Sequence, residues 1–537
     1  MAGAEPSLLL HRGRIRSLAG ARTDGTWLAL RGNRILAVGR GPVPRRLRSA
    51  PALDLKGRTV LPAFTDAHAH LLRTGLQSLQ LDLRACAAKA DVLRLVAARA
   101  PELPPGRVIR GFGWDQTAWG EDVFPSRQDL DAVAPAHPVY LERVDAHAVW
   151  VNSRLLEAAG ITTATPDPPG GAILRDARGD PTGILVDRAR ELLRPQLPDW
   201  SEEERTAAIL EGAAACHRVG ITSLHDAAVS AATLRLLHRL FGEGRLRLRV
   251  YTMLHDEEAV AEALPLGPRV GLYDGLLTIR AVKLFVDGAL GSRGAALLEP
   301  YQDAPGERGL LLMDEEAIAQ EAGRALTFGF QVCAHAIGDR ANRETLRAYR
   351  RLREPFPEIS AARLRVEHAQ VVHPADRGAF GDLGLIASIQ PTHATTDMRW
   401  AAARLGPERL AGAYAWRSLR KAGAVLAGGS DAPIEALSPL AGVYAAVTRQ
   451  DAAGNPPGGF RPEERLTVRE ALQLFTRGAA YAAFEERERG SLRPGALADL
   501  VVLSTDPFLA APKELLEITV DHTILDGTVV YAREGAD

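Results

Sequence analysis

The chain has 537 residues, of which 46% are hydrophobic and 24% are charged, as in an ordinary globular protein. The 65 basic and 66 acidic residues nearly cancel, so the composition gives no argument for nucleic acid or a membrane as a partner. The three cysteines are odd in number and far apart in sequence, and no apolar run of about 18 residues is present. We therefore expect a soluble, cytoplasmic protein without a disulfide framework.

Both ends of the chain carry short segments with the alternating pattern of β-strands. These segments are residues 7–18, 26–40, 498–503 and 522–532. Asp526 and Gly527 lie within the last of them and predict a tight hairpin turn. We expect one β-sandwich domain that residues 1–61 and 486–537 build together.

Between residues 62 and 485, apolar runs that resemble strands alternate with helical segments such as 315–326. The strand-like runs are residues 60–70, 220–227, 246–254, 277–288, 330–339, 363–370, 385–394 and 424–433. Eight strands that alternate with helices predict an α/β fold of the (β/α)8 TIM barrel type.

Residues 75–200 interrupt this alternation. The stretch is rich in proline and glycine, as in ATPDPPGGAIL, and it has strand-like runs of its own, such as RVIRGFGW. We interpret it as an insertion after the first barrel strand, long enough to form a lid or a subdomain.

The first predicted barrel strand ends in the sequence FTDAHAHL, which contains His68 and His70. A strand projects residues i and i+2 to the same side, so the two imidazoles point together. Each neutral ring offers a nitrogen lone pair, and the pair therefore suits a divalent metal. Two ordinary loop histidines are the alternative for this stretch taken alone.

Other predicted barrel strands also end in residues that could bind a metal. These are Lys283 in the fourth strand, His335 in the fifth, His368 in the sixth and Asp431 after the eighth. Residues at the C-terminal ends of barrel strands converge on one site. A hydrogen-bonded core histidine is the alternative for each histidine alone, but the ordered series predicts a metal centre.

Lys283 shares one strand face with Ile279, Ala281 and Phe285, and this apolar setting disfavours the ammonium form. A salt-bridged lysine is the ordinary interpretation. The other interpretation is carboxylation by CO2, which gives a carbamate whose two oxygens can bridge two cations.

Asp431, in the sequence GGSDAP, also has two interpretations. It could cap the helix that follows. As a catalytic group it would bind the metal and carry a proton of metal-bound water, whose pKa a metal lowers from 15.7 to about 7. The two roles can coexist.

The order His-x-His, Lys, His, His, Asp on a barrel flanked by terminal β-segments resembles the metal-dependent amidohydrolase superfamily. More narrowly, the chain is similar to amidohydrolase family 3, the group that resembles N-substituted formamide deformylase. The similar stretches span nearly the whole chain and include LPAFTDAHAHL, GWDQTAW, PVYLERVDAHAVWVNS, VKLFVDGALGSRGAALLEPY, HAIGDRANRETL, RVEHAQ, GGSDAPIE and GSLRPGALADLVVL.

The resemblance implies how the ligands divide between two ions. The first ion would lie at His68, His70 and Asp431, and the second at His335 and His368. The lysine, if carboxylated, would lie between them. Zinc is the metal that we expect first, with manganese or iron as alternatives and one or two ions per chain.

Eight further residues are candidates for substrate contacts, because they lie in the insertion or follow barrel strands. They are Trp114, Asp115, His147, His225, Asp287, Arg293, Gln390 and His393. Packing is the alternative for Trp114, and a surface salt bridge is the alternative for Arg293.

We expect a hydrolase of a non-peptide carbon–nitrogen bond, of the amide or formamide type, in a small molecule. Metal-activated hydroxide would attack the carbonyl carbon, and protonated Asp431 would give its proton to the leaving nitrogen. A deaminase or an ester or lactone hydrolase on the same metals is the nearer alternative, and a non-catalytic binding protein is the farther one. A homodimer is expected only because dimers are common among soluble enzymes.

Overall fold

The computed structural model describes residues 6–19, 24–116, 119, 123–143, 148–168 and 171–535. The chain divides into two compact units, which are described separately. The first comprises Met1–Leu71 and Gly212–Asp537, and the second comprises Leu72–Glu211. No helix among the described residues is both long enough and apolar enough to cross a membrane.

The first unit contains a sheet of eight parallel strands in the order β20-β19-β18-β17-β16-β14-β13-β6, with a short antiparallel β15 (Arg269–Gly271) beside β16. The parallel strands are β6 (Phe64–Ala69), β13 (Ile221–Val229), β14 (Arg249–Leu254), β16 (Leu277–Phe285), β17 (Gln331–Ala336), β18 (Arg365–His368), β19 (Ile386–Ile389) and β20 (Val425–Gly428). Each overlaps one of the eight predicted runs. The prediction of an α/β fold with a parallel barrel sheet is confirmed.

The two ends of this sheet, β6 and β20, nearly meet. The Asp431 N–H donates to the His68 carbonyl at 2.7 Å, and the His70 N–H donates to the Ala432 carbonyl at 2.9 Å. These hydrogen bonds link the segment after the eighth strand to the first strand. They place the predicted ligands of both strands side by side.

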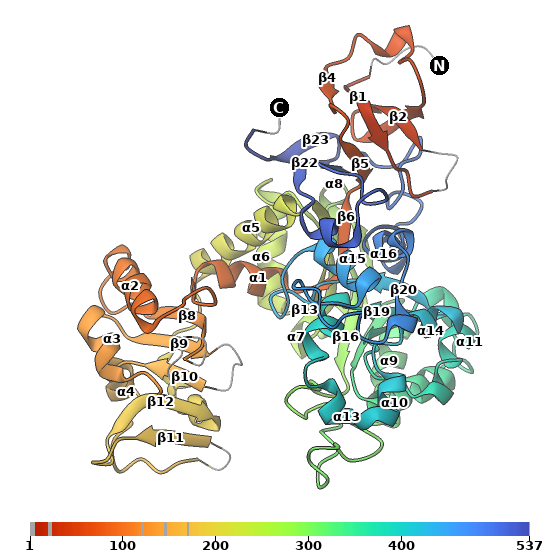
Figure 1. The fold of residues 1–537 in the computed structure, drawn as a ribbon. Helices are drawn as coiled ribbons and strands as arrows, with labels where there is room; N and C mark the ends of the chain where they lie inside the picture. The colour runs from red at the N-terminus through yellow and green to blue at the C-terminus, as the bar shows by residue number, and fades with distance from the viewer. Residues whose placement is uncertain are drawn as a thin grey trace. The chain divides into compact units, whose positions relative to one another are not determined.

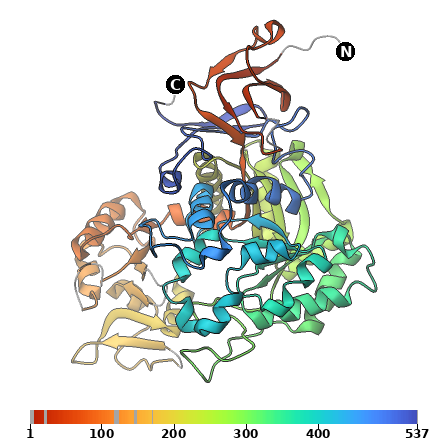
Figure 2. The same cartoon turned by 45° about the vertical axis from the view of Figure 1, so that its right-hand side comes forward.

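Helices cover the outer face of the barrel sheet. Among them, α9 (Glu315–Thr327) and α10 (Asp339–Arg351) pack on each other and on β17 (Figures 1 and 2). The predicted helix at 315–326 corresponds to α9 and is confirmed.

One helical stretch packs directly on the eighth strand. It is a π-helical segment, Leu474–Gly478, which continues α16 (Val468–Gln473). A Cβ on Gly428 would lie 2.7 Å from the Leu474 Cβ, so glycine is needed for this close approach. The eighth strand, which leads to Asp431, is thereby fixed from outside.

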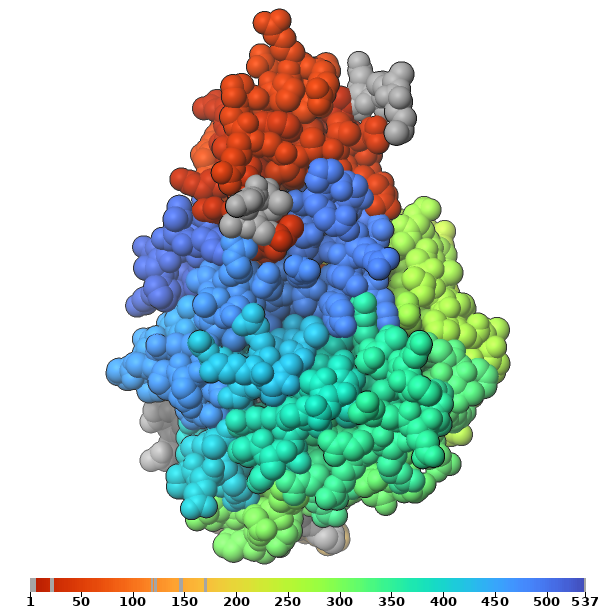
Figure 3. Space-filling view, turned by 90° about the vertical axis from the view of Figure 1, so that its right-hand side faces the viewer, coloured from red at the N-terminus to blue at the C-terminus, as the bar shows by residue number. Residues whose placement is uncertain are grey.

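Strands from both ends of the chain form one further sheet in the first unit. Its order is β23-β22-β21-β5-β1-β2-β3, with β4 beside β1. The strands are β1 (Leu8–Ile15), β2 (Gly25–Arg31), β3 (Arg34–Gly39), β4 (Ala52–Asp54), β5 (Thr59–Pro62), β21 (Leu500–Leu503), β22 (Val520–Leu525) and β23 (Thr528–Ala532). Figures 1 and 3 show N-terminal and C-terminal segments against each other. Because the described strands of the chain ends form a single sheet, a sandwich of two sheets stays a prediction.

The predicted hairpin at the C-terminus is confirmed. Asp526 and Gly527 join β22 to β23 with φ values of 51° and 73°, the left-handed values that such a two-residue turn requires. Buried residues from both chain ends, including Leu28, Val60 and Leu500, share one hydrophobic cluster. This shared core explains why the two ends fold together.

The second unit has its own six-stranded sheet, in the order β11-β12-β10-β9-β8-β7. Its strands are β7 (Leu81–Asp82), β8 (Ile109–Trp114), β9 (Val139–Arg143), β10 (Ala148–Val151), β11 (Gly171–Arg175) and β12 (Pro181–Asp187), and its helices include α2 (Lys89–Arg99), α3 (Arg127–Val133) and α4 (Ser153–Ala158). Trp114 and Trp150 belong to one of its hydrophobic clusters, with ring centroids 6.1 Å apart. Residues 75–200 fall in this unit, while the predicted domain boundaries and the role of a lid stay predictions.

Candidate metal centre

Side chains from three barrel strands, and from the segment after a fourth, converge at the C-terminal end of the barrel. His68, His368 and Asp431 each offer one ligand atom, and these atoms lie within 4.8 Å of one another. The Nε2 of His70 lies 3.2 Å from Asp431 Oδ1. The ring centroids of His335 and His368 are 4.5 Å apart. The structure thus brings together all four predicted histidine ligands and the aspartate.

Three of these histidines have their Nδ1 atoms held by acceptors. The Nδ1 of His68 donates to Glu367 Oε2 at 2.5 Å, and that of His70 donates to the Ala227 carbonyl at 2.6 Å. The Nδ1 of His368 donates to a glutamine amide oxygen at 2.7 Å. A proton on Nδ1 leaves the lone pair on Nε2, which is the usual arrangement of a histidine that binds a metal.

Two candidate ligands have a left-handed backbone, with φ of 72° at His368 and 59° at Asp431. Neighbouring residues in a regular strand point to opposite faces, yet Glu367 and His368 both contact His68. The positive φ of His368 makes this possible. Such conformations cost about 1–3 kcal/mol each and occur where the surrounding structure holds a functional group in place.

Asp66 ties the first strand to the segment after the eighth. Its carboxylate accepts hydrogen bonds from the N–H and the hydroxyl of Ser430, at 3.1 and 2.6 Å, and from the His68 N–H at 3.0 Å. Burial raises the pKa of Asp66 to about 6, although these hydrogen bonds oppose the rise. The main chain beside the candidate ligands is therefore fixed from within the barrel.

Lys283 lies in the barrel interior and is 2% exposed. It faces Cys333 in the register of β16 and β17, and its Nζ lies 5.0 Å from the centroid of the Phe285 ring. Burial lowers the pKa of its ammonium group, although the carboxylates of Glu367 and Asp431 oppose this. No described residue forms a salt bridge with its Nζ, and its burial favours the neutral amine that carboxylation requires.

The candidate ligands have the protonation states that a metal needs. Burial lowers the pKa of His68 to about 4 and that of His335 to about 3, so both rings are neutral at pH 7. Burial alone would favour protonated Asp431, but the contact with His70 and the other nearby histidines hold its pKa well below the usual range. Neutral imidazoles and a carboxylate suit zinc, manganese or iron.

Two histidine nitrogens at the cluster are buried without a hydrogen bond from any described residue. They are the Nε2 atoms of His335 and His393. Carboxylate oxygens of Asp287 and Asp431 lie 3.4 and 3.8 Å from them, respectively. Buried polar atoms are nearly always paired, so these nitrogens are available to a cation or a substrate. The residues present therefore fit a bound divalent metal.

Four predicted substrate-binding residues lie on or after strands β13, β16 and β19. His393 stacks on His368 with centroids 6.0 Å apart, and Gln390 is the glutamine that accepts the hydrogen bond of His368. Asp287 is buried and accepts three main-chain hydrogen bonds. His225 is also buried, and its Nδ1 accepts a hydrogen bond from an arginine at 3.0 Å. Their contact with a substrate stays a prediction.

Of the other four predicted contacts, one belongs to the first unit, two belong to the second unit, and one lies outside the described residues. Arg293 forms a salt bridge with an aspartate through two hydrogen bonds of 3.1 and 3.2 Å. This is the salt bridge that was expected as the alternative to a substrate contact. In the second unit, Trp114 is 0% exposed and its Nε1 donates to a main-chain carbonyl, so packing accounts for its contacts. Asp115 accepts a hydrogen bond from an arginine at 2.7 Å. His147 lies outside the described residues.

Three residues near the predicted ligands in the chain were not predicted as site residues from the sequence. They are Arg365, Glu367 and His255. The first two lie in β18 and form a buried ion pair, with Nε and Oε1 2.6 Å apart. Although burial opposes ionisation, Arg365 and His68 hold the pKa of Glu367 well below its usual range. His255 follows β14, is exposed, and meets the Phe285 ring edge-on at 4.7 Å. Two charges at i and i+2 in an apolar strand are the signal that could have revealed the pair.

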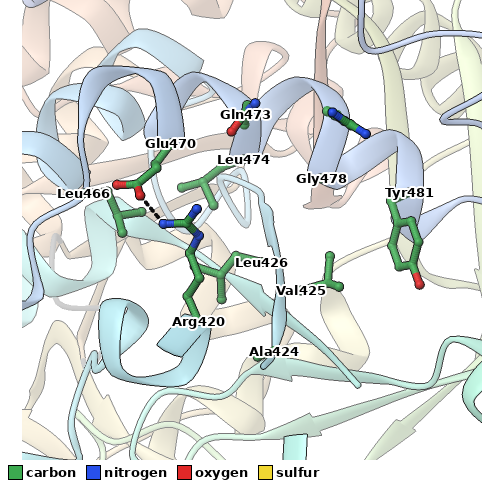
Figure 4. A pocket seen from close by; sticks show the side chains of 11 residues that line it. Arg420, Ala424, Val425, Leu426, Leu466, Glu470, Gln473, Leu474, Gly478 and Tyr481 are labelled. Atoms are coloured by element: carbon green, nitrogen blue, oxygen red, sulfur yellow. Dashed lines mark hydrogen bonds and ion pairs between the residues drawn. The ribbon is translucent and has the colours of Figure 1, made fainter. Parts of the chain in front are cut away.

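A cavity of about 290 Å³ lies elsewhere in the first unit (Figure 4). The start of β20, including Val425 and Leu426, lines it together with α14 (Trp416–Lys421), α16 and the π-helical segment. Arg420 and Glu470 form an ion pair at this cavity (Figure 4). None of the candidate metal ligands is among the residues that line it.

A sequence model of the amidohydrolase family matches residues 52–531. The chain belongs to the amidohydrolase family. This amidohydrolase is 35% identical to YtcJ of Bacillus subtilis (strain 168) over 486 residues, which cover 90% of each chain. It is 30% identical to N-substituted formamide deformylase of Arthrobacter pascens over 548 residues, which cover 98% of this chain and 99% of that relative.

The fold of this amidohydrolase is similar to that of an uncharacterized metal-dependent hydrolase from Pyrococcus furiosus. The TM-score is 0.76 and the sequences are 31% identical, over 93% of this chain and 99% of the other. The resemblance to amidohydrolase family 3 is confirmed. The family and this neighbour identify the protein as a hydrolase, and the cluster of His68, His368 and Asp431 supports a divalent metal.

Proposed function

We propose that this amidohydrolase hydrolyses a non-peptide carbon–nitrogen bond, of the amide or formamide type, in a small molecule. The observation that carries the proposal is the arrangement of His68, His70 and His368 around Asp431. The Nδ1 atoms of all three histidines are held by acceptors, which leaves three Nε2 lone pairs at one carboxylate. The relative named N-substituted formamide deformylase supports the choice of bond.

The proposed ligands are His68, His70, Lys283, His335, His368 and Asp431. The first two histidines and the aspartate would hold one divalent cation, and the other two histidines would hold a second, with carboxylated lysine between them. When bound, such cations polarise a carbonyl group and lower the pKa of water. Zinc is proposed first, because imidazole and carboxylate are among its usual ligands, with manganese or iron as alternatives.

Asp431 is the proposed proton carrier. Water adds to the carbonyl carbon while the Asp431 carboxylate takes one of its protons, and the same group then gives this proton to the leaving nitrogen as the carbon–nitrogen bond breaks. Its pKa is held low in the free site, so the carboxylate is ionised and can act as the base. His68 and His335 do not compete for the proton, because burial lowers the pKa of both.

His393 is the proposed substrate contact with the clearest chemistry. Its Nε2 is buried, makes no hydrogen bond within the described part of the chain, and lies 3.8 Å from Asp431 Oδ2. A ring nitrogen in this position could bind the carbonyl oxygen or the leaving group of a substrate. Substitution of His393 by glutamine should therefore raise KM, while the free energy of unfolding stays close to that of the wild type.

The test of the proposal compares the wild type with Asp431→Asn on N-substituted formamides and simple amides. The wild type should hydrolyse them, and Asp431→Asn should lower kcat by about 10²–10⁴-fold, the usual effect of losing a general acid–base group. Asp376→Asn is the control, because this carboxylate binds Arg343 at 2.8 Å and is not part of the cluster.

Two results would overturn the proposal. Full activity of Asp431→Asn on a genuine substrate would exclude this residue as the proton carrier. Activity confined to esters, lactones or the deamination of amino-substituted rings would replace the amide bond with one of the rival reactions.

A further inference from the structure

Two oppositely charged residues of β18 lie inside the barrel beside the candidate metal centre. Arg365 and Glu367 are both 0% exposed, and their i, i+2 spacing puts them on one face of the strand. Arg365 Nε donates to Glu367 Oε1 at 2.6 Å, and its Nη2 donates to Oε2 at 3.1 Å. Burial of ionised groups is costly even when they are paired, so a pair at this position calls for an explanation.

The pair holds His68 at two points. Glu367 Oε2 accepts a hydrogen bond from the ring Nδ1 at 2.5 Å. Arg365 Nη2 donates to the carbonyl of Ala67, the preceding residue, at 2.6 Å. The first contact sets the rotation of the ring and the position of its proton, and the second holds the main chain from which the ring projects.

Arg365 is itself fixed by neighbouring strands. Its guanidinium donates to Ser388 Oγ on β19 and to His225 Nδ1 on β13, each at 3.0 Å. The planar guanidinium has five donors in a rigid arrangement, so several simultaneous contacts hold it in one orientation. His225 is buried, and this hydrogen bond from Arg365 gives its Nδ1 a partner.

His68 differs in this respect from the other oriented histidines. The Nδ1 of His70 donates to a main-chain carbonyl, and that of His368 donates to Gln390, whereas that of His68 meets a carboxylate. A carboxylate acceptor raises the basicity of a metal-binding imidazole more than a neutral acceptor does. The candidate centre is therefore electrostatically asymmetric, with its strongest orienting contact at His68.

We propose that Arg365 and Glu367 are a positioning pair that sets how tightly the cation at His68 is bound. The inference rests on the metal site of the proposed function. Glu367 fixes the orientation and the protonated nitrogen of the imidazole, while Arg365 aims Glu367 and balances its charge. Both act through His68 rather than on the substrate.

The test measures zinc affinity and stability in the full-length chain for the wild type, Glu367→Gln and the double variant Arg365→Met/Glu367→Leu. Metal-free protein is titrated with Zn²⁺ against a chromophoric chelator, and thermal unfolding of the metal-free protein is followed in parallel. Glu367→Gln keeps an acceptor oxygen but loses the charge, and it should weaken Zn²⁺ binding by about 10–100-fold, the range for loss of such outer partners.

The double variant keeps the test decisive if Glu367→Gln folds poorly. It removes both charges, so no unpaired charge is left buried, and it should fold like the wild type while binding Zn²⁺ as weakly as Glu367→Gln. Glu464→Gln is the matched control, because Glu464 is also buried, at 2% exposed, but binds Ser418 rather than a histidine. It should bind Zn²⁺ as tightly as the wild type.

The outcomes separate this inference from the proposed function. If both variants of the pair bind Zn²⁺ as tightly as the wild type, whatever their unfolding temperature, Arg365 and Glu367 have a purely structural role. This result would overturn the inference. A wild type that binds none of Zn²⁺, Mn²⁺ and Fe²⁺ would overturn the metal site itself.

Discussion

The main-chain N–H of Asp431 donates a hydrogen bond to the carbonyl oxygen of His68, with the two atoms 2.7 Å apart. The side chains of the same residues also approach each other, with His68 Nε2 3.6 Å from Asp431 Oδ1. One contact closes the barrel between its last and first strands, and the other belongs to the candidate metal centre. The geometry of the centre therefore depends on the closure between β6 and β20.

Gly429 lies at this closure, where no methyl group fits. A Cβ there would lie 2.5 Å from the His68 nitrogen and 2.8 Å from Asp66 Oδ1. Gly429→Ala should push β20 away from β6, destabilise the protein by about 1–3 kcal/mol, as overpacking does, and weaken zinc binding. Urea unfolding and zinc titration measure the two effects. Gly378→Ala is the control, because a Cβ there meets nothing within 4 Å; equal behaviour of the two variants would contradict a tight closure.

Lys283→Met tests whether the lysine belongs to the metal centre. The side chain is buried and methionine has a similar length, so the fold should be kept. The metal content should fall from about two ions per chain to about one, because the bridge of a two-metal site is lost. Elemental analysis of both proteins measures this change. An unchanged content of about two would remove Lys283 from the site.

Asp397 provides a pH-dependent test of the fold. Its carboxylate accepts hydrogen bonds from Tyr414 and Gln370, at 2.7 and 3.1 Å, and burial raises its pKa from 3.8 to about 6. The folded state then binds this proton more tightly than the unfolded state. Its contribution to stability is complete below about pH 4 and is lost as the pH rises through about 6.

Between about pH 4 and pH 7, the free energy of unfolding of the wild type should fall by about 3 kcal/mol relative to that of Asp397→Asn. Urea unfolding of the metal-free proteins at several pH values measures the difference. Asp382→Asn, at an exposed position, is the control and should follow the wild type. Parallel curves for the wild type and Asp397→Asn would show that this carboxyl does not titrate as stated.

A buried ion pair links the barrel to the sheet of the chain ends. Arg249 in β14 donates to Asp499, the residue before β21, at 2.8 and 3.2 Å. Asp499→Ala should lower the free energy of unfolding by about 1.5–3 kcal/mol, because the buried Arg249 loses one of its two carboxylate partners and keeps Asp526. Asp54→Ala, which breaks a surface pair with Arg12, should cost only about 0–1 kcal/mol in the same urea experiment. Equally small losses would mean that the buried pair does not couple the two sheets.

The barrel strands could be predicted because each contains a short apolar run, and most of the runs end in a polar residue. The period of a strand also placed His68 and His70 together, and the structure puts both beside Asp431. His368 marks the limit of that reasoning. Strand alternation would turn it away from the face of Glu367, and only its φ of 72° brings both residues to His68. Strand alternation alone cannot reveal a left-handed φ at a residue other than glycine.

The contacts that a side chain makes in the folded protein were the second feature that could not be predicted from the sequence. His225 ends its strand, as a pocket residue would, yet its ring accepts a hydrogen bond from Arg365, 140 positions further along the chain. Trp114 lies near the end of β8 but is enclosed in the hydrophobic cluster of the second unit. The position of a residue at a strand end predicts the end of the sheet at which it lies. Its side-chain partners depend on contacts between segments that are distant in sequence.

The central claim is tested most directly by the metal content of the purified protein, measured by elemental analysis without added metal or chelator. The account predicts at least one divalent ion per chain, and close to two if Lys283 completes the centre. It also predicts that replacement of His68 and His368 by alanine removes the ions from a chain that stays folded. A folded wild type that holds no ion, and gains no hydrolase activity when zinc or manganese is added, would contradict it.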